Sequence, residues 1–100
     1  MTAIFERLVG AGIQLLPLAE ITTHYVFERA GYVCLVERNG DGGFGGVGGP
    51  GLLTGRGYAA LVMHGDAFRF VGRGFDEAAT EVQVKECRSF ARDLETALRG

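Results

Sequence analysis

Arg56, Tyr58 and Arg73 are the side chains whose types and spacing best suit a binding chemistry. Arg56 and Tyr58 stand two positions apart, which places them on one face of an extended strand. If Tyr58 lies opposite Arg73 in a hairpin, two guanidinium groups and a phenol meet beside a glycine-rich segment. Guanidinium groups hold carboxylates and phosphates through paired hydrogen bonds, so the three residues predict a site for a small anionic ligand. The alternative is that Arg56 and Arg73 are solvated, or paired with Asp76 or Glu77.

His24 and Glu37 are the second candidate pair, since general acid–base catalysis needs an imidazole that is oriented by a partner such as a carboxylate. The pairing of the first predicted hairpin places these two side chains directly opposite each other. The same arrangement occurs in any cross-strand pair of opposite charge on a protein surface. The sequence indicates no third partner, so an acid–base enzyme is the least favoured of three function classes.

The cysteines and histidines offer no pattern for a metal or a cofactor. Cys34, Cys87, His24 and His64 lack the short mutual spacings that are typical of zinc ligands. We expect the two cysteines to be small core residues that remain thiols in a reducing cytoplasm. Ser89 is the single serine, and it lacks the sequence context of a catalytic nucleophile.

Ten of the seventeen glycines fall within residues 39–57. No GK[ST] motif follows them and the segment joins two predicted strands, so a phosphate-binding loop is not indicated. Glycine-rich chain loses much conformational entropy when it becomes ordered, and we therefore predict a flexible connector. In an alternative, Phe44, Val47, Leu52 and Leu53 dock the segment onto a groove or a partner chain.

Four elements flank this segment. Apolar periodicity predicts helices over 3–16 and 76–99, the second starting at Asp76 or at the capping-box pattern from Thr80 to Gln83. Aromatic and β-branched runs predict hairpins over 23–38 and 58–73. The turns Ala30-Gly31 and Gly65-Asp66 set the registers Arg29–Tyr32, Phe27–Cys34, Tyr25–Val36, Met63–Phe68, Leu61–Phe70 and Val62–Arg69.

These elements predict one α+β domain over residues 1–100, in the order α-β-β-β-β-α. A four-stranded, mainly antiparallel sheet would pack against the two helices. The amphipathic second helix suits one sheet face. The first helix is apolar on almost every side, which indicates burial on more than one side.

The second sheet face leads to a prediction about assembly. A strand with one face in water alternates between apolar and polar residues, whereas both hairpins contain continuous apolar runs. The residues predicted to form an interface between two copies are Val26, Val33, Leu35, Ala60, Val62 and Val71. An apolar centre with a charged rim is the anatomy of a protein interface. In the alternative, the first helix covers this face within a single chain.

The charge and the apolar content of the chain limit the classes of molecule that it could bind. The formal charge of −2 argues against nucleic acids and anionic membranes, which attract a basic excess. No apolar run approaches the roughly 18–20 residues of a membrane span, and Glu6 with Arg7 interrupts any secretory signal. We therefore expect a cytoplasmic protein without a cofactor that works as a homo-oligomeric assembly module, with another protein as a possible partner. A small-ligand binder that uses Arg56, Tyr58 and Arg73 is the alternative.

Overall fold

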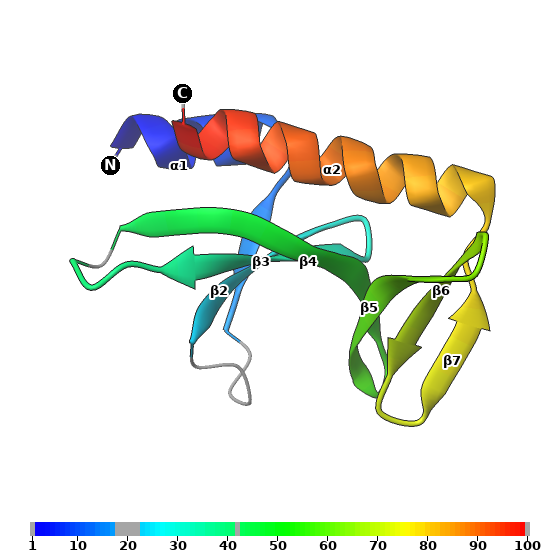
Figure 1. Cartoon of the computed structure of the whole chain (residues 1–100). Helices are drawn as coiled ribbons and strands as arrows, with labels where there is room; N and C mark the ends of the chain where they lie inside the picture. The colour runs from blue at the N-terminus through cyan, green and yellow to red at the C-terminus, as the bar shows by residue number, and fades with distance from the viewer. Residues whose placement is uncertain (1, 18–22, 42, 100) are drawn as a thin grey trace.

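The computed structural model describes residues 2–17, 23–41 and 43–99. Within these ranges seven strands form one sheet in which each strand pairs antiparallel with the next along the chain. Both helices lie on the same side of this sheet (Figure 1). The elements are α1 (Thr2–Gly10), β1 (Gln14–Leu16), β2 (His24–Arg29), β3 (Tyr32–Arg38), β4 (Phe44–Thr54), β5 (Gly57–His64), β6 (Ala67–Gly72), β7 (Phe75–Ala78) and α2 (Glu81–Arg99).

The predicted four-stranded sheet is therefore wrong in its strand number, although the α+β class and the two helices fit. The three further strands arise where the sequence predicted other structure. β1 lies at the end of the predicted helix 3–16, and β7 overlaps the start of the predicted helix 76–99. β4 occupies most of the predicted connector 39–57.

The first helix is shorter than predicted because glycine, and not Pro17, ends it. Gly12 adopts a left-handed conformation with φ of 73°. The N–H of the next residue, Ile13, then donates to the carbonyl of Leu8 at 2.9 Å, a typical helix C-terminal arrangement. The chain is thereby turned into β1, where Gln14 pairs with Glu28 of β2.

The registers of both predicted hairpins are confirmed. Ala30 and Gly31 have φ values of 55° and 89°, the two positive values that a tight type I′ hairpin turn requires. The observed pairs include Phe27 with Cys34, Tyr25 with Val36, His24 with Glu37, Leu61 with Phe70 and Met63 with Phe68. The side chains that face each other across these hairpins are thus the predicted ones.

β4 is a long, bent strand that joins two parts of the sheet. It pairs with β3 from Phe44 to Leu52, with irregular register, but with β5 only from Gly51 to Thr54. Gly49 lies at the bend with φ of 55°. β5, β6 and β7 consequently run at a steep angle to β2 and β3 (Figure 1). The sheet therefore bends at β4, and the prediction that residues 39–57 only connect two hairpins is wrong, because residues 44–54 form a strand.

The main core lies between the sheet and α2. Phe27, Cys34, Val36, Ala59 and Phe70 from the sheet pack with Cys87, Phe90, Leu94 and Leu98 from the helix. α2 begins at the predicted capping box, where the Thr80 hydroxyl accepts from the Gln83 N–H at 3.1 Å and the Gln83 amide oxygen accepts from the Thr80 N–H at 2.9 Å. At its other end Arg99 donates to the carbonyls of Phe44, at 3.2 Å, and Gly45. The C-terminal end of α2 therefore holds the first residues of β4.

α1 lies beside α2 and does not cross to the other side of the sheet. Leu8 belongs to the core under α2, and the Arg7 guanidinium donates to the carbonyl of Ala97 at 2.8 Å. The alternative in which α1 covers the second sheet face is therefore wrong. On that face Val26 and Val33 are nonetheless buried, with 2% and 0% of their surfaces exposed.

Candidate functional site

The structure does not bring Arg56, Tyr58 and Arg73 together into the predicted anion site. The Tyr58 hydroxyl donates to the carbonyl of Gly49 at 2.6 Å, and burial, followed by the nearby Cys34 and Cys87 thiols, raises the pKa of this phenol to about 12. Arg56 donates to the carbonyl of Gly74 at 3.3 Å. Among the described residues no hydrogen bond links Tyr58 to either arginine.

Arg73 lies exposed in the turn between β6 and β7, and it has neither of the predicted carboxylate partners. Asp76 pairs instead with Arg69, across 2.7 Å between the Nε and Oδ1 atoms. The Tyr58 hydroxyl is thus bonded to the backbone of β4, and only the two arginines remain, at neighbouring turns. These two side chains by themselves provide weak and solvent-screened attraction for an anion.

His24 and Glu37 lie opposite each other, as predicted, yet no hydrogen bond between them is present. The His24 Nδ1 atom is 2.8 Å from the Thr23 hydroxyl, and Glu37 is exposed. A histidine that acts as a general base needs a partner, such as a carboxylate, that orients its imidazole ring. Here the Thr23 hydroxyl, and not Glu37, contacts the ring. The geometry is that of a cross-strand surface pair.

Cys34 and Cys87 are both fully buried thiols. Burial raises the pKa of Cys34 to about 12, with a smaller contribution from Cys87, and it raises the pKa of Cys87 to about 11. Thiols of this kind stay protonated at neutral pH and are poor nucleophiles. Among the residues that the structure describes, no three His, Cys, Asp or Glu side chains are placed to hold a metal ion.

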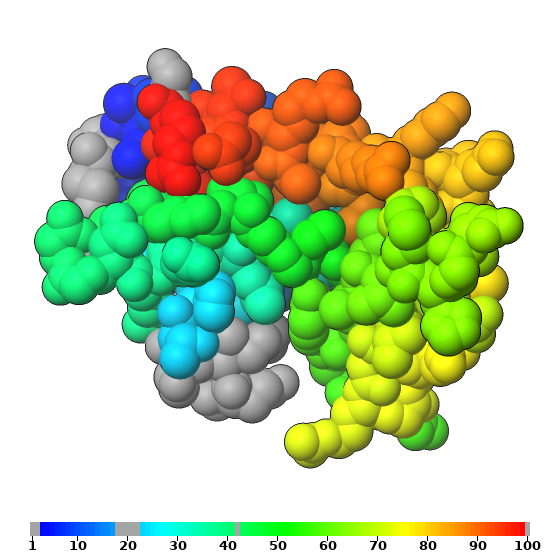
Figure 2. All heavy atoms as spheres, viewed as in Figure 1, coloured from blue at the N-terminus to red at the C-terminus, as the bar shows by residue number. Residues whose placement is uncertain are grey.

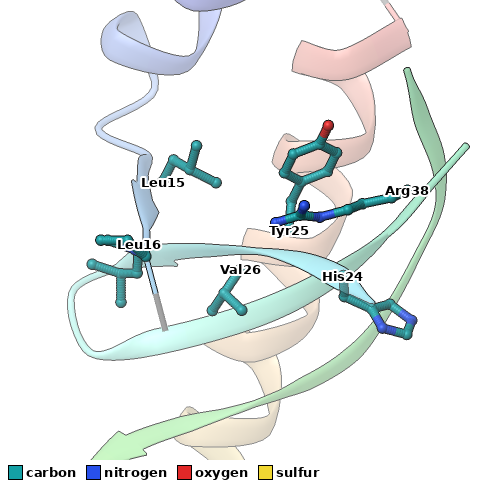
Figure 3. A pocket seen from close by; sticks show the side chains of 7 residues that line it. Leu15, Leu16, His24, Tyr25, Val26 and Arg38 are labelled. Carbon is teal, nitrogen blue, oxygen red and sulfur yellow. The ribbon is translucent and has the colours of Figure 1, made fainter. Parts of the chain in front are cut away.

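A hollow that the sequence did not reveal lies where β1 leaves the edge of the sheet (Figure 3). β1 has three residues and its last pair joins Leu16 to Val26, so β2 continues beyond β1 through Tyr25 and His24. β1 ends at Leu16, and the next residue, Pro17, has no N–H to continue the ladder. The resulting cavity of about 320 Å³ is lined by Leu15, Leu16, Pro17, His24, Tyr25, Val26 and Arg38.

Arg38 is the charged member of this hollow. Its guanidinium carbon lies 4.5 Å from the centre of the Tyr25 ring, and that ring in turn meets Phe44 edge-on at 5.1 Å between centres. In Figure 3 the guanidinium reaches across β2 beside Tyr25, while Leu15 and Leu16 lie on the other side of the hollow. In the part of the site that the structure describes, apolar walls are thus combined with the positioned cation of Arg38.

A sequence signal for this site did exist. The predicted register pairs Tyr25 with Val36, and alternation along the strand then places Arg38 on the same face as Tyr25. The wall formed by Leu15 and Leu16 could not be predicted, because the sequence pattern places these two residues in a helix. The hollow depends on where β1 ends, and nothing in the sequence indicated β1.

Within the described residues, neither helix is long and apolar enough to cross a lipid bilayer. Comparison of the chain with protein-family models, with curated proteins and with solved structures finds no match.

Proposed function

We propose that the chain is a small assembly module in which two copies associate through the sheet face that points away from both helices. We name this surface the open face and define it by Leu53, Ala60, Val62 and Val71. The observation that carries the proposal is the position of the helices: both lie on the opposite side, so within the described residues no helix covers these side chains. Leu53, Val62 and Val71 are each 38% exposed.

The orientation of these residues follows from their neighbours. Ala59 and Phe70 belong to the core under α2, and successive side chains of a strand point to opposite faces. Ala60 pairs with Val71, so the two lie side by side on the face that α2 does not cover. Burying apolar surface is favourable by about 25 cal/mol for each Å², so covering the open face would stabilise an association of two copies.

The charges beside the open face favour a second copy of the same chain as the cover. Arg69 and Asp76 neutralise each other across 2.7 Å, and Arg69 lies opposite Val62 on β5. Near a two-fold axis each side chain meets its own copy, so an unpaired charge there would repel itself. Apolar side chains flanked by a neutral ion pair avoid that repulsion.

The contact is narrower than the one predicted from the sequence. Val26 and Val33 are buried within their own chain, and Leu35 is half-buried. The remaining predicted residues, Ala60, Val62 and Val71, are joined by Leu53 at the end of β4. A stable interface usually buries about 800 Å² on each partner, so the contact has to include the rim around Arg69 as well.

We expect the module to work in a reducing compartment such as the cytoplasm. Cys34 and Cys87 are free thiols on neighbouring layers of the core, and their burial fits a chain whose stability does not depend on a disulfide.

The test is the mass of the protein in solution, measured by light scattering over a wide concentration range. We expect twice the chain mass of 10.7 kDa. Val62→Glu should give a folded monomer, because the introduced carboxylate lies opposite Arg69 in the same chain but would be buried between copies. Val82→Glu, at a 63% exposed position on α2, is the matched control and should remain dimeric. A wild-type monomer at high concentration, or a dimeric Val62→Glu variant, would overturn the proposal.

A further inference from the structure

The hollow beside β1 has walls that favour an apolar group. Leu15, Leu16 and Val26 line it, and Leu15 is 49% exposed although it is a large apolar residue on an edge strand. Pro17 adds an apolar ring and has no backbone N–H to offer. A volume of about 320 Å³ is at the small end of the range of ligand sites, which spans about 300–1,000 Å³.

Arg38 is the cation among the described residues that line the hollow, and none of the described carboxylates neutralises it. The Arg38 guanidinium carbon lies over the Tyr25 ring, 4.5 Å from its centre, and a guanidinium carries five N–H donors in a planar fork. Within the described residues the ion pairs engage other arginines, namely Arg29 with Asp93, Arg69 with Asp76 and Arg99 with Glu95. No carboxylate of that part of the chain lies within ion-pair distance of Arg38.

His24 is a further polar side chain of the hollow and lies at its rim. The ring points away from Leu15 and Leu16 in Figure 3, and its Nδ1 atom faces the Thr23 hydroxyl at 2.8 Å. Among the lining residues that the structure describes, Arg38 is therefore the permanent charge of the hollow. One planar fork matches the geometry and charge of a carboxylate, whereas a phosphate dianion is usually held by several cations or N–H groups.

We infer that this hollow binds a small organic carboxylate with an apolar body, its carboxylate on the edge of the Arg38 guanidinium and its body against Leu15 and Leu16 at the edge of the sheet. The inference is independent of the proposed dimer, because these residues belong to β1 and β3 and the open face belongs to β4, β5 and β6. It also differs from the anion site that the sequence predicted at Arg56, Tyr58 and Arg73.

Octanoate is a suitable probe, and 1-octanol is its uncharged counterpart. Each is titrated into the ¹⁵N-labelled wild-type protein while the amide signals are followed by NMR. We expect octanoate to shift the signals of Leu15, Leu16, Tyr25 and Arg38 at saturation. A hydrogen bond to a charged group strengthens binding by about tenfold or more, so octanoate should bind at least that much more tightly than octanol.

Arg38→Gln removes the charge at an exposed position and should leave the fold unchanged. The affinity for octanoate should then fall to that for octanol, and octanol binding should not change. Arg92→Gln is the matched control, since Arg92 is an exposed arginine of α2 outside the hollow, and it should bind octanoate like the wild type. Equal affinities of the wild type for the two probes, shifts centred elsewhere, or undiminished octanoate binding by Arg38→Gln would overturn the inference.

Discussion

Gly51→Ala should destabilise the protein strongly, whereas Gly46→Ala in the same strand should not. A Cβ atom added at Gly51 would lie 2.2 Å from the carbonyl oxygen of Ala59 and 2.9 Å from Cε1 of Tyr58. The oxygen belongs to the backbone of β5, so relief requires β4 and β5 to separate where Gly51 pairs with Ala60. Overpacking of this kind costs about 1–3 kcal/mol, and a backbone clash belongs at the upper end.

Gly46 supplies the comparison within β4. A Cβ atom there would meet nothing within 4 Å, and the backbone is not in the left-handed region. Alanine at a compatible glycine position stabilises a protein by about 0.4–1 kcal/mol, because the unfolded chain loses conformational freedom. The two variants should therefore differ by about 3 kcal/mol, or about 12–24 °C in Tm for a domain of this size.

Thermal and urea unfolding, followed by circular dichroism, measure this difference. Both variants add one methyl group to a glycine of the same strand, so side-chain chemistry and the length of the chain are matched. A flexible connector over residues 39–57 would tolerate alanine at either position. Stabilities of both variants within about 0.5 kcal/mol of the wild type would refute the close packing of β4 against β5.

Two further predictions concern α2 and the core. Thr80→Ala should cost about 1 kcal/mol in unfolding free energy, since it removes the hydroxyl that caps the Gln83 N–H, and Thr80→Ser should restore most of it. The unfolding midpoint in urea measures this; equal midpoints for Thr80→Ala and the wild type would contradict the cap. The raised pKa values of Cys34, about 12, and Cys87, about 11, mean that the folded state favours the protonated thiols. Their contribution to stability should be complete below pH 9.0, the ordinary thiol pKa, and be lost as the pH rises through 11 and 12. Cys34→Ala should flatten this alkaline decline in urea unfolding, and an unchanged slope would count against the assignment.

The features that the sequence determined by itself are local ones. Ala30-Gly31 and Gly65-Asp66 set the hairpin registers because a short turn fixes the pairing of the residues beside it. The capping box at Thr80 formed as predicted because its two hydrogen bonds join residues three positions apart. In both cases the interacting groups are close in the chain, so the pattern of residue types is sufficient.

The short strands could not be read in the same way. Gln14–Leu16 and Phe75–Ala78 become β1 and β7 because the edges of β2 and β6 supply hydrogen-bonding partners. Apolar periodicity placed Gln14–Leu16 in a helix, and the earlier of the two predicted starts of the second helix placed residues 76–78 in one as well. Pairing with a neighbouring strand overrode both. The hollow beside β1 depends on the end of this short strand, which explains why only its Tyr25–Arg38 side could be deduced from the sequence.

β4 shows most directly what tertiary structure decided. Glycine-rich chain has the highest entropic cost of ordering, and residue types alone therefore favour a loop. In the folded protein β3 pairs along one side of the segment, β5 pairs with its end, and Arg99 of α2 bonds its first carbonyls. The absence of a side chain at Gly51 then lets the backbone of Ala59 approach. The same glycines that indicate flexibility in an isolated segment allow close strand packing, because the partners that order them come from distant parts of the chain.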